Sequence, residues 1–201
     1  MPNLYPAFER QEVVVHSPRH VRSFAELGDE EVAAVATAWE ARREAALAEG
    51  FNYVHALINE GAAAGSSLPH SHSQLVWLRE RPPEVAHETG DPAELLRELV
   101  VAARGAMRAA VHRAGRLPYE TLIGGEPFEL AGALLLLRDV VARLRAVEGN
   151  VPWNAWLHSP AGGGHHIELV PRLSVLAGVE LGAGIYVNTV APEDAAATLR
   201  S

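Results

Sequence analysis

The stretch of sequence that decides the fold is residues 59–78, which read NEGAAAGSSLPHSHSQLVWL. The first half consists of small residues that follow an apolar strand candidate, residues 53–58, and small residues let the backbone come close to a ligand. The second half enters another strand through His70, His72 and Gln74. Residues two apart on an extended chain point to the same side, so these three side chains share one face. The stretch predicts a strand–loop–strand unit that presents two imidazoles and a carboxamide together.

This set of side chains suits attack on phosphorus. A neutral imidazole nitrogen can act as the nucleophile, while an amide donor stabilises a non-bridging oxygen. Asn59 and Ser67 lie close enough in sequence to help hold phosphates. Spacing alone leaves two other interpretations open, namely an ordinary loop with structural histidines, or a metal site that uses His70 and His72.

The composition excludes several other chemistries. The chain has 201 residues, no Lys and no Cys, so lysine Schiff bases, thiolate nucleophiles, disulfides and cysteine zinc sites are impossible within it. The 25 acidic and 17 basic residues give a formal charge of −8, which disfavours nucleic acid as a partner. The apolar run of residues 130–137 is too short to span a bilayer, and no signal peptide opens the sequence, so we expect a cytoplasmic protein without membrane contact. The chemistry that remains rests mainly on ten histidines.

Periodicity and turn signals predict an α+β fold, with antiparallel sheet flanked by helices. The expected strands are residues 12–15, 53–58, 75–78, 117–123, 153–158 and 166–170, and the expected helices are residues 29–49, 128–147 and 194–200. Residues 99–112 fit either the continuation of a helix or two strands joined at Gly105. The polar, proline-bearing residues 79–91 are the best boundary, which predicts two halves, residues 1–90 and residues 91–201.

Residues 59–74 closely resemble the active-site motif of the galactose-1-phosphate uridylyltransferases, a branch of the histidine-triad superfamily. That motif runs N-x-G, small residues, S-x-P-H-P-H-x-Q, and Ser71 replaces the proline between the two histidines. Other pieces agree in order along the chain: residues 3–7, 12–20, 116–120, 153–158, 166–172 and 177–182. The resemblance implies two histidine-triad-like halves, and it favours two strands over a helix in residues 99–112.

The resemblance also implies an activity. It makes His72 the nucleophile that takes a uridylyl group from a UDP-hexose, and Gln74 the residue that stabilises the covalent intermediate. Asn59 and Ser67 match positions that contact phosphate, and Asn3 matches one near the nucleotide. The partners would be a nucleotide sugar and a sugar 1-phosphate, with galactose 1-phosphate as the acceptor. The alternatives are a related nucleotide-sugar phosphorylase or adenylyltransferase, and a catalytically weak nucleotide-binding module.

For metals, the resemblance implies two positions in the chain. Glu88, His158, His166 and Glu168 match a ligand set that suits zinc or iron. His20 and His70 match a second site whose cysteine ligands this chain cannot supply, so we expect one filled site. Spacing alone also permits His158 and His166 to be solvated turn histidines.

The family sequences begin upstream of the segment that resembles residues 3–6, with a strand and phosphate-binding arginines. We therefore expect a member that lacks this N-terminal segment and exposes a sheet edge, which a homodimer would cover.

Overall fold

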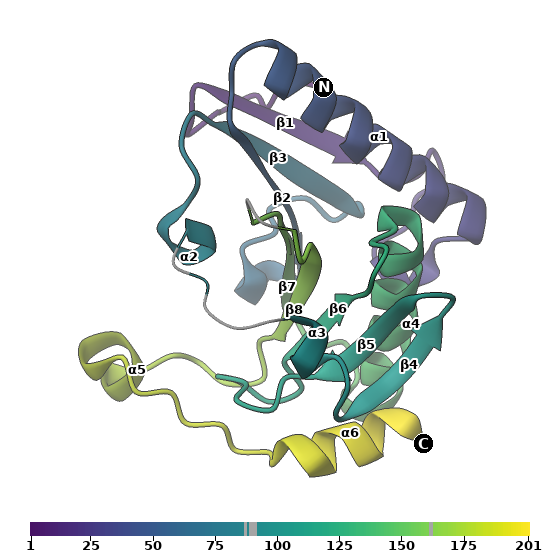
Figure 1. Ribbon diagram of the computed structural model, residues 1–201, viewed down its shortest axis with the longest axis vertical. Coiled ribbons are helices and arrows are strands. Elements are labelled where there is room, and N and C mark those ends of the chain that lie inside the picture. The colour runs from purple at the N-terminus through teal and green to yellow at the C-terminus, as the bar shows by residue number, and fades with distance from the viewer. Residues whose placement is uncertain (87, 89–91, 161–162) are drawn as a thin grey trace.

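Eight antiparallel strands form a single sheet in the computed structural model, which describes residues 1–86, 88, 92–160 and 163–201 (Figure 1). The strand order is β1-β3-β2-β7-β8-β6-β5-β4, and every neighbouring pair is antiparallel. The strands are β1 (Arg10–Val15), β2 (Tyr53–Glu60), β3 (His72–Leu78), β4 (Val100–Arg104), β5 (Met107–Val111), β6 (Thr121–Gly124), β7 (Trp153–His158) and β8 (His166–Pro171). The predicted α+β class with antiparallel sheet is confirmed.

Two long helices cover one face of this sheet. α1 (Asp29–Ala48) packs on β2 and β3, and α4 (Leu130–Glu148) packs on β4, β5, β6 and β8. Trp39 and Leu134 lie at the centre of this layer and are almost fully buried. Gly28 is the N-terminal cap of α1, and the Glu31 carboxylate accepts its N–H at 2.8 Å.

Because side chains alternate along a strand, the opposite face of the sheet carries the even-numbered residues of β3, β7 and β8. Along β3, Ser73, Leu75 and Trp77 point toward the helices and are buried. His72 and Gln74 therefore lie on the face away from α1 and α4.

Two strands occupy the segment whose propensity favours a helix. β4 and β5 meet at Gly105, whose φ of +57° suits glycine in a tight turn. The strand predicted over residues 117–123 is shorter than expected: β6 begins at Thr121, because Tyr119 takes a positive φ of 61° in the preceding turn.

The strands of residues 1–90 and those of residues 91–201 join in one sheet where β2 pairs with β7. The division into two halves at this boundary stays a prediction, and part of the boundary lies outside the described residues. The glycine-rich turn between β7 and β8 likewise falls partly outside them.

The remaining helical segments are short: η1 (Phe24–Glu26), η2 (Ala62–Ala64), α2 (Pro83–Ala86), α3 (Pro92–Leu95), α5 (Gly178–Ala183) and α6 (Pro192–Arg200). α5 was not expected from the sequence, and it projects away from the sheet (Figure 1). None of the described helices has the length and apolar character needed to cross a membrane.

Candidate active site and metal centre

The loop between β2 and β3 delivers His72 as the first residue of β3, with only 5% of the residue exposed. The His72 Nδ1 atom lies 2.8 Å from the His70 carbonyl oxygen. A carbonyl oxygen can only accept, so Nδ1 donates and carries the ring hydrogen. The lone pair of the neutral ring is then on Nε2, which is the arrangement that a nucleophilic imidazole needs.

Ser71, the residue that departs from the family motif, is fixed by three hydrogen bonds. Its hydroxyl lies 2.8 Å from His16 Nδ1, its N–H donates to Val21 O at 2.8 Å, and its carbonyl accepts the His16 N–H at 3.2 Å. Burial, together with the charges of His72 and His70, lowers the pKa of His16 to about 3. His16 is therefore neutral at physiological pH, and it anchors the backbone next to His72.

Gln74 has a defined orientation. Gln11 on β1 accepts the Ala7 N–H through Oε1 and donates from Nε2 to Gln74 Oε1 at 2.7 Å. This polarity leaves the NH2 group of Gln74 as a donor toward a ligand. Asn3 lies beside the same strand, where its N–H donates to Gln11 O at 2.8 Å.

Asn59 lies at the end of the sheet at which β3 begins with His72. The pairing of β2 with antiparallel β3 ends at Leu57 and Gln74, two residues before Asn59, and Asn59 pairs with Asn154 on β7. Its Oδ1 accepts from Asn154 Nδ2 at 2.8 Å, and Asn154 Nδ2 also donates to Ala64 O at 2.8 Å. These bonds tie the small-residue loop to β7. Ser67 is exposed in that loop.

The sequence reasoning assigned no role to two residues at this end of the sheet, Asn154 and Arg172. Arg172 Nη1 donates to Asn154 Oδ1 at 3.3 Å, while its buried Nε finds no hydrogen-bond partner among the described residues. Strand periodicity could have identified Asn154, because it lies an even number of residues from His158 and therefore on the same face of the strand.

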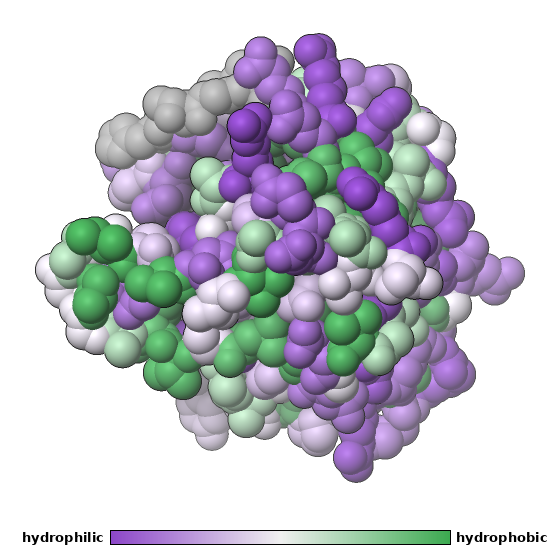
Figure 2. Space-filling model, turned by 90° about the horizontal axis from the view of Figure 1, so that it is seen from below, coloured by the Kyte–Doolittle hydropathy of each residue, from purple (hydrophilic) through white to green (hydrophobic). Residues whose placement is uncertain are grey.

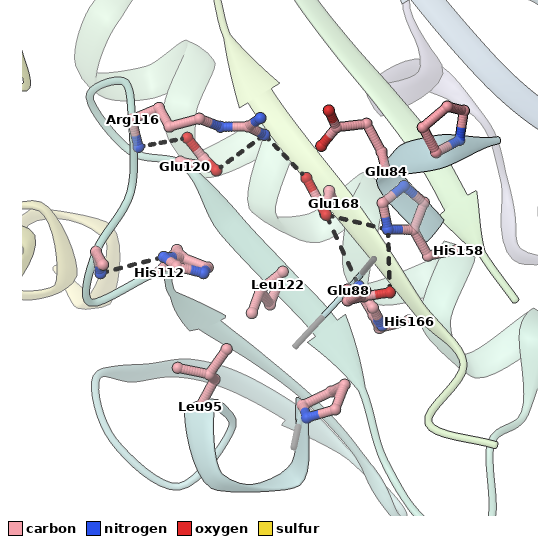
Figure 3. A pocket seen from close by; sticks show the side chains of 13 residues that line it. Glu84, Glu88, Leu95, His112, Arg116, Glu120, Leu122, His158, His166 and Glu168 are labelled. Carbon is pink, nitrogen blue, oxygen red and sulfur yellow. Dashed lines mark hydrogen bonds and ion pairs between the residues drawn. The ribbon is translucent and has the colours of Figure 1, made fainter. Parts of the chain in front are cut away.

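The second cluster lies where β7 and β8 meet, and it comprises Glu88, His158, His166 and Glu168 (Figure 3). One ligand atom from each residue lies within 4.8 Å of all the others. His166 Nε2 is 3.0 Å from Glu88 Oε1, and His158 Nδ1 is 3.2 Å from Glu168 Oε1. The structure thus brings together the four residues that the resemblance implied as metal ligands. His166 is 1% exposed and His158 is 7% exposed, so neither is a solvated turn histidine.

The protonation states of this cluster follow from burial and mutual charge. Burial lowers the pKa of His158 to about 4, so this ring is neutral at pH 7. Burial also acts on His166, but hydrogen bonds with Glu168 and with the Gly164 carbonyl outweigh it and raise the pKa of His166. Burial, together with the Glu168 charge, raises the pKa of Glu88. His158 Nδ1 and Glu88 Oε2 are buried without a hydrogen-bond partner among the described residues.

These features fit a divalent cation. The two carboxylates are acceptors only, and two imidazoles and two carboxylates form a donor set that suits zinc or ferrous iron. An ion bound among them would satisfy the two buried atoms that lack partners.

The metal cluster is separate from the nucleophile. Across the sheet, Gln74 on β3 pairs with Leu57 on β2. Leu57 pairs with Trp156 on β7, and Trp156 pairs with Glu168 on β8. That is three strand spacings, or roughly 14 Å. The cluster therefore does not touch a phosphate that is bound at His72.

His20 and His70 lie near each other, with ring centroids 5.6 Å apart. The nitrogens of His70 face backbone carbonyls, with Nε2 2.8 Å from Arg19 O and Nδ1 3.1 Å from Ser71 O. Within the described part of the chain, no third potential ligand joins this pair to make a group of three.

Two adjoining cavities open on the sheet face that carries these groups. A cavity of about 320 Å³ is lined by the metal cluster together with Arg116, Glu120 and Leu122. A second cavity, of about 520 Å³, has mostly apolar walls and includes Leu57, Val76 and Trp156.

Fold and site together define a class: α+β proteins with an H-x-H-x-Q motif on the open face of an antiparallel sheet. Residues 6–82 match the family model of the galactose-1-phosphate uridyl transferase N-terminal domain. The ADP-glucose phosphorylase of Arabidopsis thaliana is 24% identical to this chain over 235 residues. That alignment covers 96% of this chain, which spans 64% of the length of the curated relative.

Solved structures show the same fold over the whole of this chain. A GalT-like protein from Arabidopsis thaliana superposes with a TM-score of 0.89 at 24% identity, and 82% of that protein is covered. An ADP-glucose phosphorylase from the same plant, with bound ADP-glucose, gives 0.89 at 23% identity and 80% coverage. A structure described as uridylyltransferase gives 0.88 at 23% identity and 84% coverage. The resemblance seen in the sequence is confirmed: residues 6–82 match the N-terminal domain of the galactose-1-phosphate uridyl transferase family, and the whole chain shares the fold of the GalT-like structures.

Proposed function

We propose that the protein is a nucleotidyltransferase that acts on nucleotide sugars through a covalent nucleotidyl-histidine at His72. The observation that carries this proposal is the hydrogen bond from His72 Nδ1 to the His70 carbonyl oxygen, which leaves Nε2 free to attack. The sequence relationship to a nucleotide-sugar phosphorylase supports the same class of reaction.

In the first step, His72 Nε2 attacks the α-phosphorus of the nucleotide sugar. A nitrogen–phosphorus bond forms, and the bond from that phosphorus to the bridging oxygen breaks, which releases a sugar 1-phosphate. In the second step, an oxygen of the acceptor phosphate attacks the same phosphorus, and the ring of His72 is regenerated. The carbonyl of His70 accepts the Nδ1 hydrogen throughout and favours the cationic ring of the intermediate.

Gln74 would donate its NH2 group to a non-bridging oxygen of the α-phosphate. An amide does not shuttle protons, so this residue favours passage to a phosphate acceptor over hydrolysis. Asn59, Ser67 and Asn3 would contact phosphates and the nucleotide. Arg172 would add a cation at the same end of the sheet, beside Asn154.

The first candidate reaction moves a uridylyl group between a UDP-hexose and a hexose 1-phosphate, with galactose 1-phosphate as the acceptor. The second candidate is phosphorolysis of an ADP-sugar, and the relationship to ADP-glucose phosphorylase favours it. A catalytically weak nucleotide-binding module would bind the same ligands without forming the covalent intermediate.

Zinc or ferrous iron would occupy the Glu88, His158, His166 and Glu168 cluster. The ion would supply structural cross-linking of β7, β8 and the segment that carries Glu88, because the cluster lies about three strands from Gln74.

We also propose a homodimer. Residues 173–188, termed here the α5 arm, project from the molecule and are largely hydrophobic in the space-filling view (Figure 2). The large apolar side chains exposed on the arm are Leu173, Val175, Val179, Leu181, Ile185, Tyr186 and Val187. A second copy of the chain would cover this surface. Sedimentation should show a dimer that Leu181→Asp weakens, and a stable monomer at micromolar concentration would contradict the proposal.

The experiment that tests the reaction offers radiolabelled UDP-glucose and ADP-glucose separately to the wild-type protein, with galactose 1-phosphate or inorganic phosphate as acceptor. His72→Ala should abolish transfer, whereas the matched variant His165→Gln, whose ring lies next to Phe128 just before β8, should retain it. Transfer that survives in His72→Ala would refute the mechanism. Tight binding of either nucleotide sugar without transfer would favour the catalytically weak nucleotide-binding module.

A further inference from the structure

Arg116 lies outside the four candidate ligands and forms an ion pair with one of them, Glu168. Its Nη2 atom donates to Glu168 Oε2 at 3.2 Å, while the other oxygen, Oε1, faces His158 Nδ1 at 3.2 Å and His166 Nε2 at 3.8 Å (Figure 3). The two oxygens of one carboxylate are thus divided between the guanidinium and the metal cluster.

The guanidinium is itself held in place. Glu120, which is 3% exposed, accepts the N–H groups of Arg116 and Leu117 through Oε2, at 2.7 and 3.2 Å. Its Oε1 lies 3.4 Å from Arg116 Nη2. Arg116 also lies 5.9 Å from the ring of Tyr186 in the α5 arm. The head group therefore meets Glu168 from a fixed direction.

Acidic side chains outnumber basic ones around the cluster. Glu84, Glu88, Glu120 and Glu168 line its cavity together with Arg116. This excess of negative charge favours a bound cation. Without Arg116 the excess would be larger by one charge, and both oxygens of Glu168 would be free to turn toward the ion.

We propose that Arg116 is a positioning residue for the metal centre, which holds Glu168 so that a single oxygen faces the ion. This inference rests on the proposed metal site and concerns its selectivity. Restricting Glu168 to one oxygen keeps the coordination number low, which favours zinc over metals that prefer more ligands. In other metalloproteins, residues that hydrogen-bond to the metal ligands orient those ligands and tune the properties of the ion.

The test uses the purified full-length chain, stripped of metal and titrated with zinc and with cobalt(II) as a spectroscopic probe. Cobalt(II) absorbs visible light more strongly in low-coordinate sites than in sites with five or six ligands. Arg116→Gln frees both oxygens of Glu168 to face the ion, so it should raise the coordination number and lower the cobalt absorption. Arg116→Lys retains the charge but offers no planar fork, so it should recover part of the cobalt absorption.

Arg113→Gln is the matched control, because Arg113 is exposed and pairs only with Glu98 among the ion pairs of the described residues. It should behave as wild type. An Arg116→Gln protein with an unchanged cobalt spectrum would overturn the proposal whatever its affinity, because a change in affinity alone would report only the lost charge. If Arg116→Gln fails to fold, an unchanged cobalt spectrum of Arg116→Lys would overturn the proposal. Failure of the wild type to bind either metal would refute the metal site and this inference, and would leave the His72 chemistry unaffected.

Discussion

His16 offers a quantitative test of the buried network behind the nucleophile. Its ring is 3% exposed, and burial lowers its pKa from 6.5 to about 3. The unfolded chain protonates this histidine near pH 6.5, whereas the folded protein keeps it neutral. The contribution of neutral His16 to stability is therefore complete above pH 6.5 and is lost as the pH falls toward 3.

The size of the effect follows from the difference between the two pKa values. Well below pH 6.5 each pH unit costs about 1.4 kcal/mol for one proton. Because the unfolded histidine is only half protonated at pH 6.5, a fall from pH 6.5 to 4.5 should cost about 2 kcal/mol. His16→Gln removes the titrating ring and keeps a polar group near Ser71. Between pH 6.5 and 4.5, the unfolding free energy of the variant should therefore fall less steeply with decreasing pH than that of the wild type. This holds whatever the stability of the variant at pH 7.

Urea unfolding at a series of pH values, with a chelator present, measures that slope. His20→Gln is the control, because the His20 side chain is exposed, and its slope should match that of the wild type. Equal slopes for wild type and His16→Gln between pH 6.5 and 4.5 would refute the neutral, buried state of His16.

Two further predictions concern the layers on either side of the sheet. Trp39 Nε1 donates to Ser73 Oγ at 2.8 Å in the core, so Ser73→Ala should leave a buried donor unpaired and cost about 1–3 kcal/mol in chemical denaturation; no loss of stability would contradict this. On the open face, Asn154→Ala should slow covalent labelling of the protein while circular dichroism stays unchanged, because Asn154 ties Asn59 to the loop at Ala64. Labelling at the wild-type rate would show that Asn154 does not contribute to the site.

The strands and long helices could be predicted because their hydrophobic periodicity agrees with their packing. Residues 99–112 show the limit of propensity: an alanine-rich segment forms β4 and β5 because these strands pack against α4 and continue the sheet beyond β6. The α5 arm gave no periodic signal, because few of its apolar residues face the core of this chain.

The resemblance to the family implied the four residues of the metal cluster, whereas the contact of the Arg116 guanidinium with Glu168 could not be predicted. His166 and Glu168 are two apart on one strand, so their shared face followed from strand geometry. Arg116 reaches Glu168 from 52 residues away in sequence, through a turn whose shape depends on the positive φ of Tyr119. Contacts of this kind depend on tertiary structure and leave no local pattern.

The central claim is that His72 forms the covalent intermediate. The most direct measurement is mass spectrometry of the protein quenched at alkaline pH after incubation with UDP-glucose or ADP-glucose without acceptor. We predict a nucleotidyl adduct on the peptide that carries His72, which disappears when the acceptor phosphate is added. An adduct on any other residue, or turnover with no adduct at His72, would contradict the account.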